Sequence, residues 1–317
     1  MPKRRLVFFL LKLLLAVALL AAVGWKFAEF FKSVNWESLT TQLDYVSLAI
    51  AGLLYIGCHT VWGTFWVQLL RGQGVTISWW VGLRAYFVSQ FGKYVPGKAW
   101  VIFLRVGLLR SLEVRPTVVI VTGAYETLTN MAAGAVLGAA LLPWSGLTES
   151  LNTYQQYGLF GLALLPLALL GLNRLVRRVA RKYARGAIIP TPSVLLLARG
   201  LVQAMVGWAM LGLSLWFVVN GVNPDPVPLT LPLYAQYLCG VAVSYVFGFL
   251  VLFSPAGAGA REWVLQLMLA KQLASDPLAA LIAVLLRIVW TLFEVVVAIG
   301  LYFCVRGTKP TLSEPVA

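Results

Sequence analysis

The sequence predicts an all-α membrane protein, a helix bundle with about six membrane spans and two opposed helical hairpins that re-enter the membrane. Three observations lead to this prediction. Hydrophobic residues make up 60% of the 317-residue chain and charged residues 11%, against roughly 25% charged residues in soluble domains. The apolar residues fall into separate runs of helical length. Two of these runs are interrupted by proline, glycine and charged residues.

The uninterrupted runs are each close to the roughly 20 residues that a helix needs to cross a hydrocarbon core of about 30 Å. They cover residues 6–27, 46–70, 117–142, 157–173, 193–219 and 278–304. The first follows a basic start and continues to Phe27 without a turn signal, so we expect an uncleaved helix rather than a signal peptide. No long polar block is present. We therefore expect a single integral membrane domain over residues 1–317 and no soluble catalytic domain.

The two interrupted runs cover residues 79–109 and 231–273. Their breaks contain Pro96 and Gly97 in the first run and Pro255, Gly257 and Gly259 in the second. The arm after each break is too short to cross a bilayer at 1.5 Å per residue, so each run is expected to leave on the side where it entered. Non-helical backbone at membrane depth is tolerated only where it packs against protein or lines a cavity.

The charges of the loops give an orientation. Loops 28–45, 143–156 and 220–230 are mainly acidic, whereas the opposite set is basic, above all the run 174–185. The positive-inside rule then places both termini in the cytoplasm and the chain in the cytoplasmic (inner) membrane as a multi-pass protein. The net charge of +14 fits this topology and contact with anionic lipid, so we expect no nucleic-acid partner.

The same order of elements occurs twice. A span, a hairpin and a second span make up residues 46–142, and again residues 193–304. The hairpins enter from opposite sides, so the two units are predicted to be an inverted repeat. Broken helices that meet near the midplane in such repeats are typical of transporters.

Charged residues at membrane depth mark the candidate site, because each costs roughly 2.5–3.5 kcal/mol on insertion scales. The cations are Lys93, Lys98, Arg105, Arg261 and Arg287, and the carboxylates are Glu126, Glu262 and Glu294. Tyr94 shares the polar face of Lys93. Pairing leaves a positive surplus beside half-helix N-termini, which favours a phosphate or carboxylate. The glutamates are expected to hold the cations in the empty site or to engage a cationic head group.

Purely structural roles for several of these residues also remain open. Arg261 and Glu262 could form a pair that locks the hairpin, Arg105 could snorkel to the inner surface, and the prolines could be kinks. Gly134 and Gly138 fit helix packing. His59 is the only histidine and the three cysteines lack ligand spacing, so we expect no metal site and no catalytic residue. No nucleotide-binding motif occurs, and no cofactor is expected.

The two broken segments resemble those of the lysylphosphatidylglycerol synthase transmembrane domain family, whose members are described as flippase-like. The resemblance rests on Gly92-Lys93-Tyr94-Val95-Pro96-Gly97-Lys98-Ala99-Trp100 with Arg105, and on Pro255-x-Gly257-x-Gly259-x-Arg261-Glu262. It spans roughly residues 10–305. Many members carry a Gly-Glu pair after the first proline, where this chain has Ala99-Trp100-Val101, and many have glycine at the position of Ala256.

The resemblance implies a free-standing lipid translocase without the aminoacyltransferase domain of some members, and so not an enzyme. Its partner would be a membrane lipid, either an anionic phospholipid or a polyprenyl phosphate. The alternative is an accessory membrane subunit that presents a polyprenyl-phosphate lipid to a separate glycosyltransferase or other lipid-modifying enzyme. An intramembrane enzyme acting on lipid phosphates is disfavoured, because no histidine pair or acidic cluster is present.

Overall fold

The computed structural model describes residues 43–95, 100–145, 171, 191–223, 227–251 and 257–305. All regular structure in this part of the chain is helical, which confirms the all-α prediction. The helices are α3 (Tyr45–Arg71), α4 (Trp79–Ser89), η1 (Gln90–Tyr94), α5 (Trp100–Leu109), η2 (Arg110–Leu112), α6 (Pro116–Leu141), η3 (Leu142–Ser145), α9 (Val194–Val222), α10 (Leu231–Leu250), α11 (Ala260–Leu273) and α12 (Asp276–Cys304). The expected spans 6–27 and 157–173 lie outside the described residues, apart from residue 171.

Polar caps define where several of these helices begin. The side chains of five residues accept a hydrogen bond from a backbone N–H two or three positions further on: Asp44, Ser78, Ser193, Thr230 and Ser275. Such caps satisfy amide groups that have no partner within the helix. The observed starts of these helices fall within two residues of the starts expected from the sequence, which are 46, 79, 193, 231 and 278.

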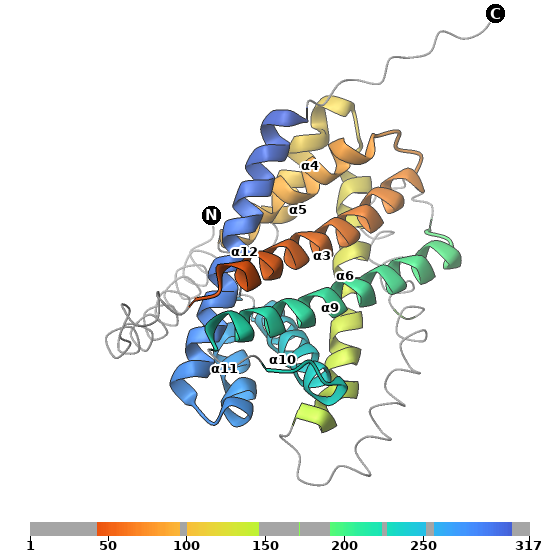
Figure 1. Ribbon diagram of the computed structural model, residues 1–317. Coiled ribbons are helices and arrows are strands. Elements are labelled where there is room, and N and C mark those ends of the chain that lie inside the picture. The colour runs from red at the N-terminus through yellow and green to blue at the C-terminus, as the bar shows by residue number, and fades with distance from the viewer. Residues whose placement is uncertain are drawn as a thin grey trace, which may run out of the picture.

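Helices α3 and α9 form the centre of the bundle and run antiparallel (Figure 1). The amide of Asp44, before α3, donates to the carbonyl of Gly221 near the end of α9 at 2.9 Å. The approach is close because glycines of α9 face aromatic rings of α3. A Cβ at Gly200 would lie 2.1 Å from the Phe65 ring, and one at Gly207 would lie 2.1 Å from the indole nitrogen of Trp62.

The other helices surround this pair in a regular way. Helices α4 and α5 lie together at one end of the molecule, and α10 and α11 lie together at the other (Figure 1). Helix α12 packs against α3, α4 and α11, and α6 packs against α9, α10 and α5. The expected helix-packing role of Gly134 and Gly138 is observed, since a Cβ at Gly134 would lie 2.3 Å from Trp208 and one at Gly138 2.9 Å from Val243.

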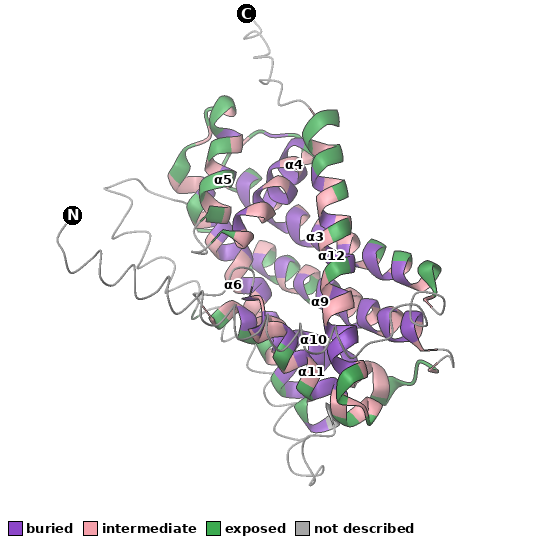
Figure 2. Ribbon diagram, turned by 90° about the vertical axis from the view of Figure 1, so that its left-hand side faces the viewer, coloured by how far each residue is buried: buried purple, intermediate pink, exposed green. Residues whose placement is uncertain are grey.

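The exposed face of α12 is apolar, as expected for a helix that faces lipid. On α12 the exposed residues Ile288, Leu292, Val296, Ile299 and Phe303 are at least half exposed and recur at helical spacing (Figure 2). By length and composition α3, α9, α10 and α12 can cross a membrane. The predicted span 117–142 forms α6, which carries the buried polar residues Thr122, Glu126, Thr129 and Asn130. The protein is therefore a multi-pass membrane protein.

The contact between η1 and α5 gives a stability prediction. A Cβ at Gly92 would lie 2.5 Å from the backbone nitrogen of Val101, and backbone cannot yield as a side chain can. We expect Gly92→Ala to destabilise the protein by about 1–3 kcal/mol, seen as a lower thermal unfolding midpoint in detergent. Gly107→Ala on α5 is the control, because a Cβ there meets nothing within 4 Å. Equal midpoints for the two variants would contradict the predicted clash.

Candidate functional site

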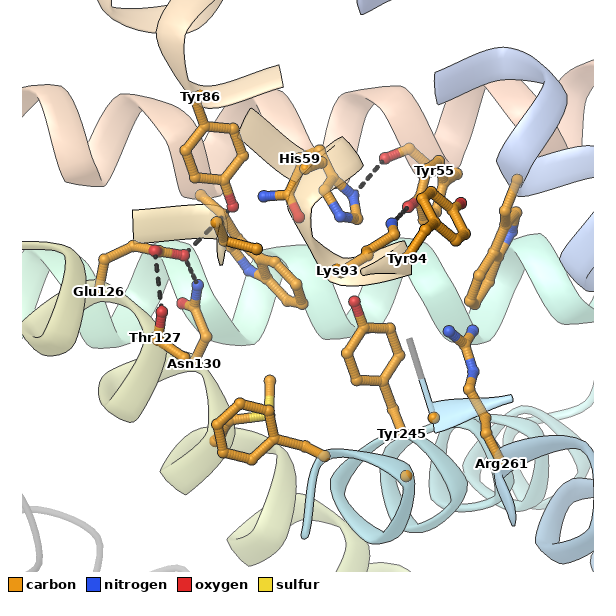
Figure 3. A pocket seen from close by; sticks show the side chains of 18 of the residues that line it. Tyr55, His59, Tyr86, Lys93, Tyr94, Glu126, Thr127, Asn130, Tyr245 and Arg261 are labelled. Carbon is orange, nitrogen blue, oxygen red and sulfur yellow. Dashed lines mark hydrogen bonds between the residues drawn. The ribbon is translucent and has the colours of Figure 1, made fainter. Parts of the chain in front are cut away.

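A cavity of about 450 Å³ lies between α3, α4 with η1, α5, α6 and the C-terminal helices α10, α11 and α12. This volume is within the range of about 300–1,000 Å³ that is typical of ligand pockets. Its wall is aromatic and cationic. The rings are Tyr55, His59, Trp62, Tyr86, Tyr94, Tyr245, Phe249 and Trp290, and the charged residues are Lys93, Arg105, Glu126, Arg261 and Arg287. Figure 3 shows Arg261 and Tyr245 on one side of the cavity and Lys93 and Tyr94 facing them.

Arg105 and Glu126 form a buried ion pair between α5 and α6. The Arg105 Nη1 to Glu126 Oε2 distance is 3.0 Å, and the residues are 2% and 3% exposed. The Arg105 guanidinium also lies 4.5 Å from the Trp66 ring centroid and 4.6 Å from that of Tyr86. Asn130 donates to Glu126 Oε1 at 2.7 Å. The cation is thus neutralised, stacked and buried, which rules out the snorkelling interpretation.

Lys93 and Glu294 form a second ion pair, between η1 and α12. The Lys93 Nζ to Glu294 Oε2 distance is 2.5 Å, and the Tyr55 hydroxyl donates to the same oxygen at 2.6 Å. The Lys93 side chain is 21% exposed, whereas that of Glu294 is 1% exposed. Lys93 therefore presents part of its charge to the cavity, while Glu294 lies behind it.

A third ion pair joins Arg287 of α12 to Glu262 of α11. Glu262 also accepts a hydrogen bond from the backbone N–H of Gly259 at 2.6 Å through its other carboxylate oxygen. It therefore caps the first turn of α11 as well as binding Arg287. The Arg287 side chain is 25% exposed. The expected lock of the second hairpin thus involves Glu262 and Arg287, and not Glu262 and Arg261.

Arg261 differs from the other cations, because it forms no hydrogen bond or ion pair with any described residue. Its guanidinium carbon lies 4.3 Å from the Tyr245 ring centroid and 4.5 Å from that of Trp290. Stacking on two rings is worth about 0.5–2 kcal/mol per contact and leaves the N–H groups free. The described part of the site contains four cations and three carboxylates. Each carboxylate pairs with one cation, and Arg261 is the cation without a carboxylate partner.

A family model described as the lysylphosphatidylglycerol synthase TM region matches residues 9–299. The chain belongs to this family. No curated protein matches the chain. Membership relates this membrane protein to lipid modification.

The second broken segment of this family member is shaped by glycines. Gly257 and Gly259 have φ angles of 71° and 83°, in the region that glycine adopts without strain. Gly257 also lies against Gly248 of α10, where an added Cβ would come within 3.0 Å of backbone atoms. These contacts bring the start of α11 close to α10 and so place Arg261 beside Tyr245.

The structure brings most of the predicted site residues to one cavity. Lys93, Tyr94, Arg105, Arg261, Arg287, Glu126 and Gly257 line it, and Glu262 and Glu294 contact the lining cations. The hydroxyl groups of Tyr94 and Thr291 lie 3.2 Å apart. Pro96, Gly97, Lys98 and Pro255 lie outside the described residues.

The sequence analysis missed the aromatic partners of the cations, namely Tyr55, Tyr245 and Trp290. A signal for one of them was present. Trp290 lies three residues after Arg287 and four before Glu294, so all three share one face of α12. Nothing in the sequence shows that Tyr245 of α10 would lie against Arg261 of α11.

The buried Arg105–Glu126 pair gives a second prediction. Glu126→Gln keeps the size of the side chain but leaves the guanidinium without a counter-charge, and losing one partner of a buried pair costs about 3–5 kcal/mol. We expect a loss of unfolding free energy of that order, measured by titration with a denaturing detergent.

Asp276→Asn is the matched control, because Asp276 is exposed at the start of α12. It should cost less than about 1 kcal/mol through the helix dipole alone. Similar losses in the two variants would show that Glu126 does not stabilise Arg105 as an ion pair.

Proposed function

We propose that the protein is a lipid translocase that binds the phosphate of a lipid head group in the cavity, with the acyl or polyprenyl tail left in the bilayer. The observation that carries this proposal is the Arg261 guanidinium, which faces the cavity without a carboxylate partner among the described residues. A guanidinium binds phosphate through parallel, charge-assisted hydrogen bonds. Arg261 also lies in the first turn of α11, where the helix dipole favours an anion.

The other predicted cations are proposed to assist phosphate binding to an extent that depends on how far each is exposed to the cavity. Lys93 and Arg287 are partly exposed to the cavity and can contact a bound phosphate while they keep their carboxylates. Arg105 is sealed by Glu126 and two rings, so it is proposed to support the wall of the site rather than to contact the phosphate directly. Lys98 is proposed as a further contact on the strength of its place in the first break.

An inverted repeat of residues 46–142 and 193–304 supports a transport role. If α3, α4, α5 and α6 correspond to α9, α10, α11 and α12, the contacts of one unit recur in the other. Helix α4 packs on α12 as α10 packs on α6, and α3 packs on α12 as α9 packs on α6. The corresponding helices α3 and α9 are antiparallel, as an inversion requires.

The side chains of the two units support the same correspondence. Arg105 of α5 stacks on Tyr86 of α4, and Arg261 of α11 stacks on Tyr245 of α10. Each arginine also contacts a tryptophan, but Trp66 belongs to α3 and Trp290 to α12, which are not counterparts, so only the tyrosine contacts support the correspondence. Both stacked arginines line the same cavity, which is where transporters with broken helices bind their substrates.

The proposed topology has six spans and two hairpins that re-enter from opposite sides, α4 with α5 and α10 with α11. Both hairpins consist of two helices packed against each other. Both termini are proposed to lie in the cytoplasm, with the basic segment 174–185 on the same side of the cytoplasmic membrane. Because α10 is long enough to cross, a label at 252–256 accessible only from the cytoplasmic side would contradict this arrangement.

The test of the proposed function is lipid translocation in proteoliposomes with fluorescent lipids of different head-group charge. We expect Arg261→Gln to slow translocation of an anionic lipid about ten- to hundredfold, because a hydrogen bond to a charged group contributes about 1.5–3 kcal/mol. Arg199→Gln on the exposed side of α9 is the matched control and should translocate at the wild-type rate.

Folding is compared by unfolding midpoint, because Arg261→Gln removes no ion pair but loses two ring contacts of about 0.5–2 kcal/mol each, and translocation is measured at a temperature at which both variants are folded. Equal rates for the two variants would contradict the role of Arg261. If folded wild-type protein translocates no lipid but forms a stable complex with a glycosyltransferase, the accessory-subunit alternative replaces the translocase.

A further inference from the structure

We infer that the cavity selects a phosphate joined to an uncharged polyol, such as a glycerol or a sugar, and discriminates against a head group that carries an amine. This inference rests on the proposed function and names the class of lipid that the same site would take. It predicts that this chain does not prefer lysylphosphatidylglycerol, the aminoacylated lipid in the name of its family. The polar groups of the cavity that have no partner among the described residues determine which head group can bind.

No carboxylate oxygen on the described wall of the cavity is available. Glu294 Oε1 has no described partner, but Glu294 is 1% exposed and lies behind Lys93. Glu126 is the only glutamate on the described wall of the cavity, and its oxygens already accept from Arg105, Asn130, Tyr86 and Thr127. A bound ammonium group would therefore find no free counter-charge on this wall. It would also lie near Arg261, the cation of the described site without a carboxylate partner, and like charges in a low-dielectric site repel strongly.

The aromatic rings beside Arg261 and Lys93 do not provide a substitute site for an amine. Rings can hold cations by stacking, but the Tyr245 and Trp290 rings already hold the Arg261 guanidinium. The ring of Tyr55 lies 6.0 Å from the Lys93 ammonium, and that of Tyr94 lies 5.2 Å from it. The rings nearest the free guanidinium thus face existing positive charges.

Neutral hydrogen-bonding groups are available. The Tyr245 hydroxyl and the Gln90 side-chain amide line the cavity without a hydrogen bond to another described residue. The His59 Nδ1 donates to the Tyr55 carbonyl at 3.2 Å, which leaves Nε2 as an acceptor without a described partner. Asn130 Oδ1 is buried and likewise has no partner there.

These groups match a polyol. A hydroxyl both donates and accepts, so it can satisfy an imidazole nitrogen, a phenol and an amide oxygen in turn. The Arg261 guanidinium supplies the phosphate contact, and Figure 3 shows the Tyr245 hydroxyl and Asn130 on the side of the cavity that extends from Arg261 towards Glu126. A head group with phosphate at one end and hydroxyls at the other can use both sets of groups together.

The test measures binding of lipids with matched tails to purified wild-type protein by tryptophan fluorescence. Phosphatidylmethanol carries one phosphodiester charge and no hydroxyl. Phosphatidylglycerol adds two hydroxyls, and lysylphosphatidylglycerol has a lysyl ester with two amino groups in place of one of these hydroxyls. We expect phosphatidylglycerol to bind at least about tenfold more tightly than the lysyl lipid and severalfold more tightly than phosphatidylmethanol. A fourth ligand, a polyprenyl-phosphate hexose, shows whether the site binds a polyprenyl lipid or a phospholipid more tightly when both carry a phosphate and hydroxyl groups.

Tyr245→Phe removes only the hydroxyl and keeps the ring on Arg261. It should lower the ratio of phosphatidylglycerol to phosphatidylmethanol affinity about two- to tenfold, whereas Tyr302→Phe, outside the cavity, should leave that ratio unchanged. Lysyl lipid binding as tight as phosphatidylglycerol, or an unchanged ratio in Tyr245→Phe, would overturn the inference. The expected binding order without any translocation would instead refute the transport role and leave the head-group preference standing.

Discussion

The need to neutralise charge inside an apolar bundle governs the arrangement of this protein. A buried ion costs several kcal/mol unless a counter-ion and hydrogen bonds compensate it. Three carboxylates provide this compensation, and each joins two elements: Glu126 joins α6 to α5, Glu294 joins α12 to η1, and Glu262 joins α11 to α12. Helix α12 contributes to two of the pairs, so its position is linked to both broken segments. The same charges that were candidates for binding therefore also hold the cavity walls in place.

Close backbone approach is the second condition for the cavity. Gly92 lets η1 lie against the start of α5, and Gly248 and Gly257 let α10 lie against the start of α11. These contacts hold Lys93 and Arg261 on opposite sides of one space. Larger residues at these positions would separate the helix pairs, and the cations would no longer face the same cavity.

The sequence predicted the parts of this site that depend on spacing along one helix. The buried stripe of α6, the position of the helices and the identity of the charged residues all follow from periodicity and composition. It could not predict which cation meets which carboxylate, because Glu262 contacts Arg287 across a helix pair while its neighbour Arg261 points elsewhere. Adjacent residues on a helix face different directions, so the suggested Arg261–Glu262 pair was wrong. The aromatic stacking was also missed, since it joins residues on different helices.

Arg105 and Arg261 have similar aromatic surroundings but differ in how their charge is compensated. Both arginines stack on a tyrosine and a tryptophan, and both line the cavity. If stacking alone made an arginine stable at this depth, neither would need a carboxylate, yet Arg105 has one 3.0 Å away. If a carboxylate were needed only for structure, Arg261 would be expected to have one too. The difference is explained if the counter-ion of Arg261 is the ligand itself, which neutralises the site when it binds and leaves a free positive charge when it departs.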